Sequence, residues 1–163
     1  MKTYDCTDDV NAHKFKVRYW MRGFAHLIQL RADLHDASKL LPPEKACFDE
    51  WTPKMKATEI GTPAYADNLR AMGDCLKHHY QENRHHPEHY ENGVDGMTLH
   101  DLVEMLCDWM AVSEDKGTPV NLEYFRLRFK LSDQLVNILR NTLKEEDIWN
   151  AIAGVPVIDF IQE

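Results

Sequence analysis

The chain has 163 residues, enough for one domain with a core of its own. Its formal net charge of −8 argues against a protein that wraps nucleic acid or binds anionic membranes. No apolar run approaches the length of a membrane span, and the first ten residues lack the apolar segment of a signal peptide. The four cysteines form no Cys-x-x-Cys pair, which favours reduced thiols and a cytoplasmic location.

Apolar residues recur three and four positions apart over residues 9–30, which predicts a first helix. His13 shares the apolar face of this helix with Trp20 and Phe24, whereas His26 faces the opposite side. We therefore expect His13 to point inward. A lone inward histidine is more often a hydrogen-bonded core residue than a metal ligand.

The next stretch, "LHDASK", places a histidine and an aspartate side by side, and a short helix is predicted over residues 34–41. On a helix His35 and Asp36 point about 100° apart and can still converge on one cation. Lys39 follows Asp36 by three residues and shares its face. The alternative is an ordinary aspartate at a helix end, beside a surface histidine, with Lys39 only pairing with Asp36.

Thr62 and the proline after it are typical of a helix start. This helix is predicted to run to about Arg84, because Pro87 biases His86 away from helical angles.

Four of the nine histidines lie in "HHYQENRHH", residues 78–86. His79 continues the stripe of Leu69, Met72 and Leu76, which predicts that His79 points inward and His78 does not. The alternative is a histidine pair that stabilises the C-terminal end of a helix. That alternative explains His78 better than it explains His79.

A further helix is predicted between Thr98 and Gly117, with Asp101, Glu104 and Asp108 in one narrow arc. Asp101 stands three residues after Thr98, which is the spacing of a capping box. Glu104 and Asp108 are compatible with a solvated face. Because this helix is apolar around most of its circumference, a carboxylate on it needs a partner, and Asp108 is the best candidate.

The last helical region covers residues 122–143 and is expected to break near Ser132, while the tail over residues 154–163 is ambiguous. Period-two alternation is rare along the chain. The expected fold is therefore all-α, with one domain over residues 1–163.

Together, His13, His35, Asp36 and Asp108 would supply one metal site from three predicted helices. Imidazoles mixed with carboxylates suit manganese, iron, cobalt, nickel or zinc better than calcium, and magnesium is also compatible.

The "HDASK" stretch resembles the signature of the HD-domain metal-dependent phosphohydrolases. His13, 22 residues before His35, matches the upstream histidine of that superfamily, and Asp108 in "EMLCDWMA" resembles its closing aspartate. His79 and His86 resemble the additional histidines of members that bind several metals. The resemblance implies an all-helical domain with one or more divalent metals.

The chain also resembles an uncharacterised family of small phage and bacterial proteins with the patterns "HDxSK", "HYxxNxHHPE" and "EMxxDW". This similarity covers about residues 10–112 and brings no known activity.

The chain departs from the HD-domain pattern at one position that matters for acid–base chemistry. Small HD-domain nucleotidases often have glutamate after "HDAS", where this chain has Lys39. Glu44 and Glu104 are the candidates to replace that glutamate as catalytic residues. Lys39 resembles the lysine of "HDxGK" proteins, where it can contact a phosphate.

The expected activity is metal-assisted hydrolysis of a phosphate ester, with a nucleotide as the preferred substrate by analogy. Asp36 would act as ligand and base, and Lys39, Arg18, Arg22 or Arg84 would neutralise charge on the phosphoryl group. A homo-oligomer is compatible with the sequence. Two alternatives stay open: a di-iron carboxylate oxygenase, and an inert helical module that binds a nucleotide or a protein.

Overall fold

The computed structural model describes residues 3–153, with side chains described as far as residue 145, so the ambiguous tail over residues 154–163 lies outside the described part. The chain divides into two compact units, residues 1–35 and residues 36–163, and each is described by itself.

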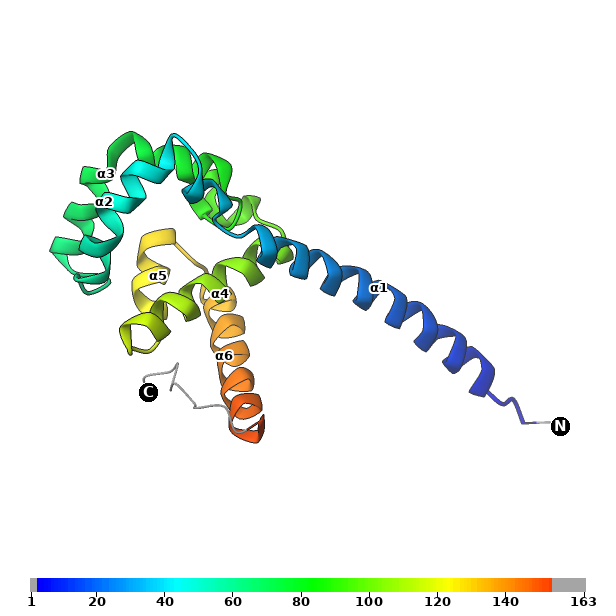
Figure 1. Cartoon of the computed structure of the whole chain (residues 1–163). Coiled ribbons are helices and arrows are strands. Elements are labelled where there is room, and N and C mark those ends of the chain that lie inside the picture. Colours follow the sequence, from blue (N-terminus) through cyan, green and yellow to red (C-terminus); the bar gives the residue numbers. More distant parts are fainter. Residues whose placement is uncertain (1–2, 154–163) are drawn as a thin grey trace. The chain divides into compact units, whose positions relative to one another are not determined.

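The first unit is one continuous helix, α1 (Thr7–Leu34), as the periodicity over residues 9–30 predicted (Figure 1). Asp8 and Asp9 lie in its first turn and Arg31 in its last turn. This distribution complements the helix dipole at both ends.

Within residues 36–153, the second unit holds five α-helices and three short 3₁₀ turns. They are α2 (Glu44–Lys56), α3 (Pro63–Glu82), α4 (Leu99–Lys116), α5 (Leu122–Phe129), α6 (Asp133–Ala153), η1 (Ala37–Leu40), η2 (Pro87–His89) and η3 (Gly93–Gly96). Residues 3–153 contain no strand, so the predicted all-α class is confirmed. Within the same residues, no helix combines the length and the apolar composition that a membrane crossing requires.

The predicted helix starts are formed by side chains that cap the first turn. Thr62 accepts a hydrogen bond from the backbone N–H of Tyr65 at 3.3 Å. Thr98 and Asp101 form the expected capping box, since each side chain accepts a hydrogen bond from the backbone N–H of the other residue.

The last helical region breaks where the sequence predicted. Lys130 has a positive φ of 54° and ends α5. The hydroxyl of Ser132 then accepts a hydrogen bond from the N–H of Leu135 at 3.2 Å and starts the next helix.

The core of the second unit is built on α4, α5 and α6 and centres on parallel aromatic rings. Trp109 and Phe125 stack with their ring centroids 3.8 Å apart, and the ring of Phe129 lies 5.9 Å from that of Trp109. Met105 and Leu143 are fully buried beside them. Stacked aromatic rings of this kind contribute large buried areas, and they fix α4 against α5.

Helices α2 and α3 lie side by side (Figure 1) and are joined by a disulfide between Cys47 and Cys75. The expectation of reduced thiols was wrong for this pair. The cysteines are 28 residues apart in sequence, but the helix pairing brings their Cα atoms to 6.5 Å. The bond lies one turn from Glu44 on α2 and one turn from His79 on α3.

Candidate metal centre

A turn at His35 and Asp36 divides the short helix that was predicted over residues 34–41, so that Leu34 ends α1 and only residues 37–40 form a separate 3₁₀ turn. His35 leaves α1 with a ψ of 127°, and Asp36 has a left-handed φ of 56°. Aspartate is one of the few residue types that adopt this conformation readily. The N–H of Lys39 then donates to the carbonyl of Asp36 at 2.9 Å, which begins η1. The prediction that His35 and Asp36 sit on one helix was therefore wrong.

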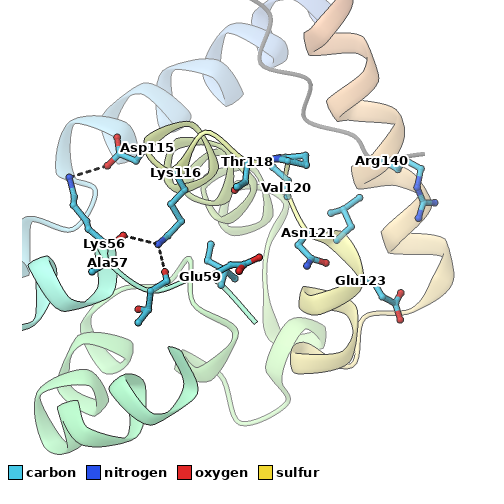
Figure 2. A pocket seen from close by; sticks show the side chains of 14 residues that line it. Lys56, Ala57, Glu59, Asp115, Lys116, Thr118, Val120, Asn121, Glu123 and Arg140 are labelled. Atoms are coloured by element: carbon cyan, nitrogen blue, oxygen red, sulfur yellow. Dashed lines mark hydrogen bonds and ion pairs between the residues drawn. The ribbon is translucent and has the colours of Figure 1, made fainter. Parts of the chain in front are cut away.

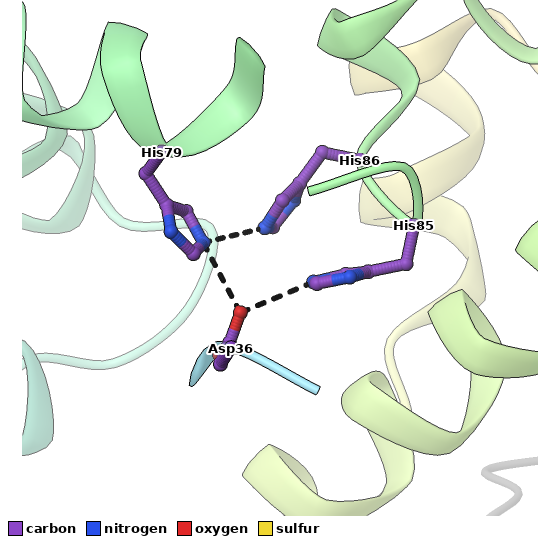
Figure 3. A group of neighbouring side chains, drawn as sticks. All are labelled: Asp36, His79, His85 and His86. Atoms are coloured by element: carbon purple, nitrogen blue, oxygen red, sulfur yellow. Dashed lines mark hydrogen bonds and ion pairs between the residues drawn. The ribbon is translucent and has the colours of Figure 1, made fainter. Parts of the chain in front are cut away.

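Asp36 lies against three imidazole rings that come from one end of α3 and the segment after it (Figure 3). Its Oδ1 is 3.3 Å from Nε2 of His79 and 3.5 Å from Nε2 of His85. Nε2 of His79 is in turn 2.9 Å from Nε2 of His86. One possible ligand atom from each of these four residues lies within 4.8 Å of every other. We call Asp36, His79, His85 and His86 the histidine–aspartate cluster.

The end of α3 determines how two of these histidines reach the cluster. Asn83 ends the helix with an extended φ of −112°, and its amide donates to the carbonyl of His79 and to the hydroxyl of Ser38, both at 2.8 Å. The chain therefore turns back after Asn83. His86 has φ −92° and ψ 126°, which confirms the effect predicted for Pro87.

Glu44 is fully buried and holds the ring of His79 from the side opposite Asp36. Its Oε2 lies 2.9 Å from Nδ1 of His79 and accepts a hydrogen bond from the hydroxyl of Ser38 at 2.8 Å. Its Oε1 lies 2.8 Å from Nδ1 of the half-exposed His78. Burial alone would raise the pKa of Glu44, but the hydrogen bonds from His78, His79 and Ser38 outweigh burial and lower the pKa below its ordinary value.

Glu104 has the same relation to His85. Its Oε1 lies 3.0 Å from Nδ1 of His85, while Nε2 of His85 faces Asp36. Both glutamates that the sequence offered as acid–base residues therefore contact an imidazole Nδ1. In these positions Glu44 and Glu104 orient the rings of the cluster.

Burial favours the neutral form of two histidines of the cluster, His79 and His86. It lowers the pKa of His79, and the nearby ammonium of Lys39 lowers it further. Burial also holds the pKa of His86 well below its ordinary value. A neutral imidazole offers one nitrogen lone pair, which is the form that binds a metal ion.

The second oxygen of Asp36 is directed to Lys39. The ammonium of Lys39 donates to Asp36 Oδ2 at 2.5 Å and lies 4.8 Å from the centre of the Phe48 ring. The expectation that Lys39 and Asp36 share a face is confirmed, although through a 3₁₀ turn. Asp36 thus presents one oxygen to the histidines and one to a cation.

Asp108 is half-buried on α4 and lines the same cavity as Asp36, His79 and His86. One of its carboxylate oxygens lies within 4.8 Å of an oxygen of Asp36. The structure therefore brings this predicted ligand close to the cluster.

Arg84 does not have the position expected of a substrate-binding residue. Its guanidinium lies 3.3 Å from Asp101 and packs over the ring of Tyr90, and Arg84 is not among the described residues that line the cavity. The reason is that α3 ends at Glu82, so the Arg84 side chain follows the turn toward the start of α4.

The remaining predicted residues belong to the first unit. His13, Arg18 and Arg22 lie on α1 with exposed side chains, and His35 directly follows this helix. Their contribution to the site stays a prediction.

His85 was not predicted as a ligand, although the sequence shows it beside His86. Helical phasing identified His79 because α3 continues through that residue. Beyond Asn83 the backbone is extended, so no helical period could assign the rings of the second pair. The usable signal was the density of histidines over residues 78–86.

A second cavity, of about 690 Å³, lies between the end of α2 and the start of α5 (Figure 2). The ammonium of Lys116 donates there to the carbonyls of Met55 and Thr58, at 3.0 and 2.6 Å, and Lys56 pairs with Asp115 at 3.2 Å. These cations are engaged in joining α2 to α4. No histidine is among the described residues that line this cavity, so the smaller cavity at the cluster is the better candidate site.

No curated protein and no solved structure shows significant similarity to the chain. The family model that matches it, over residues 2–145, is described as a family of unknown function (DUF5662). Because this match covers most of the sequence, the chain belongs to the family of unknown function DUF5662.

Proposed function

We propose that the histidine–aspartate cluster binds a divalent transition metal and that the protein hydrolyses a phosphate ester. The observation that carries the proposal is the contact of Asp36 Oδ1 with Nε2 of His79 and Nε2 of His85, at 3.3 and 3.5 Å.

That contact brings hydrogen-bond acceptors together. In the tautomer in which Glu44 and Glu104 accept from Nδ1–H, Nε2 of His79 and Nε2 of His85 carry the lone pairs. Both lone pairs then face a carboxylate oxygen of Asp36. A cation between these atoms would relieve the repulsion, and burial disfavours the other solution at His79, which is to protonate its ring.

The ligand chemistry fits a transition metal. Three imidazole nitrogens and one carboxylate oxygen suit manganese, iron, cobalt, nickel or zinc, whereas calcium prefers oxygen ligands. The contacts of Glu44 and Glu104 with Nδ1 resemble the carboxylate–histidine pairs that support metal ligands in proteins.

Lys39 supports the hydrolytic role. A divalent cation held by the cluster would act as a Lewis acid on a phosphoryl oxygen and would lower the pKa of water. Lys39, which contacts Asp36, would place an ammonium beside the same phosphoryl group and neutralise its developing charge. Asp36 would accept a proton from the attacking water. The resemblance to HD-domain phosphohydrolases supports the same reaction, with a nucleotide as substrate by analogy only.

A di-iron carboxylate oxygenase fits the geometry less well. Such sites use several carboxylates as direct ligands. Here Glu44 and Glu104 contact imidazole rings, and only Asp36 contributes an oxygen to the four-residue group.

The proposal is tested by measuring the metal content of the purified protein and then phosphate release. Release would be screened over nucleotides and simple phosphate esters with Mn²⁺, Co²⁺, Ni²⁺ and Mg²⁺. We expect bound metal and metal-dependent release, both lost in Asp36→Asn. Metal binding without turnover on any ester would favour a non-catalytic binding module, and oxygen consumption by an iron-loaded protein would favour an oxygenase.

A further inference from the structure

The cavity at the cluster continues into an apolar groove. It has a volume of about 380 Å³ and is lined by residues of α2, α3, α4 and α5. The α3 wall consists of Tyr65, Leu69, Met72 and Leu76, and the next residue on this face is His79. The helix face that carries a histidine of the cluster is therefore apolar along the rest of its length.

The groove is long as well as apolar. His79 is fourteen positions after Tyr65, and Gly73 kinks α3 between them, so this wall spans at most about 20 Å. Helix α2 lines the same groove with Phe48, Thr52 and Met55, which follow one another at helical spacing. An extended group that starts at the cluster would thus contact apolar side chains over most of its length.

The other walls also carry charged side chains, among them Asp108 beside the cluster and Arg128. Arg128 lines the groove, but its guanidinium donates to the hydroxyl of Tyr80 at 2.9 Å and to Glu88 at 2.8 Å. The Arg128 charge is balanced by Glu88, which leaves no second phosphate site on this wall.

The cation that meets the groove at the cluster end is Lys39, whose ammonium lies over the ring of Phe48. The charges at the other end are engaged, because Lys56 pairs with Asp115 and Lys116 donates to backbone carbonyls. A ligand that matches this distribution has one anionic head and an apolar body. A nucleotide matches it poorly, since its sugar and base edges require hydrogen-bond partners along the walls.

We propose that the groove binds the apolar organic part of the substrate, so that the preferred substrates are phosphate monoesters of alkyl alcohols, with the phosphate at Lys39 and the cluster. This inference rests on the proposed phosphohydrolase function for the position of the head group. The occupant is a small amphiphilic ester rather than a nucleotide or a protein segment.

The test compares ethyl, butyl, hexyl and octyl phosphate with a nucleoside monophosphate as substrates. In parallel, calorimetry measures binding of the matching alkylphosphonates, which are not hydrolysed. We expect kcat/KM and phosphonate affinity to rise by up to about fourfold per added methylene group, as burial of a methylene predicts. Thr52→Trp should fill the groove and abolish the dependence on chain length. Thr52 is exposed, so the substitution disturbs no buried packing.

Glu50→Trp is the matched control, because Glu50 is exposed on the same helix and does not line the groove. Chain-length-dependent phosphonate binding without any ester hydrolysis would support the groove assignment and reject the proposed function. Hydrolysis that is independent of chain length, or a preference for the nucleotide, would overturn the groove assignment and leave the function standing. Absence of both hydrolysis and phosphonate binding would overturn both. A further outcome is that the protein self-associates, that Thr52→Trp removes the self-association, and that alkyl chain length affects neither hydrolysis nor phosphonate binding. This outcome would assign the groove to a second copy of the chain and overturn the inference.

Discussion

Oε2 of Glu44 lies 2.9 Å from Nδ1 of His79, and Glu44 is fully buried. The contact fixes the ring so that Nε2 faces Asp36. Ser38 donates to the same carboxylate and accepts from Asn83, so the serine of "HDASK" and the asparagine of "HYxxNxHHPE" belong to one hydrogen-bond network. This network explains why a serine follows the histidine–aspartate pair by two residues.

Glu44→Gln should weaken metal binding about 10-fold to 100-fold, because an amide cannot hold the imidazole as a carboxylate does. Titration calorimetry with Zn²⁺ or Mn²⁺ measures the effect. Glu50→Gln on the same helix is the control and should leave the affinity unchanged, since its side chain is exposed. Equal affinities for Glu44→Gln and the control would show that Glu44 has only a structural role.

His79→Ala should lower metal occupancy far more than His78→Ala. His79 is buried, and its Nε2 belongs to the cluster. His78 is half-exposed, and its Nδ1 contacts Oε1 of Glu44. Metal content after dialysis compares the two variants, with thermal unfolding to verify that both fold. A larger loss in His78→Ala would contradict the assignment of the rings.

Lys39→Ala should retain the metal but lower phosphate release by roughly 10-fold to 1000-fold, the usual effect of removing one charge-stabilising donor. The reason is that Lys39 contacts Asp36 Oδ2, while Oδ1 faces the histidines. Full turnover in Lys39→Ala, with metal still bound, would reduce Lys39 to an ion-pair partner of Asp36.

Asp101 should make the stability of the protein depend on acid pH. Burial would raise the pKa of Asp101, but hydrogen bonds from Thr98, Tyr90 and Arg84 outweigh burial and hold the pKa well below its ordinary value. A carboxyl whose pKa is lowered on folding adds stability above its unfolded-state pKa, near 4, and loses this contribution as the pH falls through the folded-state pKa.

Asp101→Asn should therefore cost about 2 kcal/mol in the free energy of unfolding at pH 7. Urea unfolding from pH 7 to pH 3 should show the difference from wild type shrinking toward the acid end. Glu114→Gln, at an exposed position of the same helix, should show no such trend. A difference that stays constant with pH would mean that the Asp101 charge does not stabilise the fold.

Much of the fold could be predicted because local signals determine it. Apolar periodicity located the helices, and Thr62, Thr98, Gly117 and Ser132 marked their ends. The same periodicity predicted that His79 points inward, and the structure buries His79 although Gly73 kinks α3 ahead of it.

The site could be predicted only in part. The left-handed backbone of Asp36 and the reversal after Asn83 depend on contacts between distant segments, so helical phasing gave the wrong local structure for Asp36 and left His85 unassigned. The disulfide between Cys47 and Cys75 was missed for the same reason, since only the pairing of α2 with α3 brings them together.

The central claim is that Asp36 and the three histidines beside it hold a metal ion. The most direct measurement is the metal stoichiometry of the protein by elemental analysis, after loading with Mn²⁺, Co²⁺, Ni²⁺ or Zn²⁺ and dialysis, in wild type, Asp36→Asn, His85→Ala and His78→Ala. The geometry predicts at least one ion per chain in wild type and His78→Ala, and its loss in Asp36→Asn and His85→Ala. A wild-type protein that retains no metal, or Asp36→Asn and His85→Ala proteins that retain it fully, would contradict the claim.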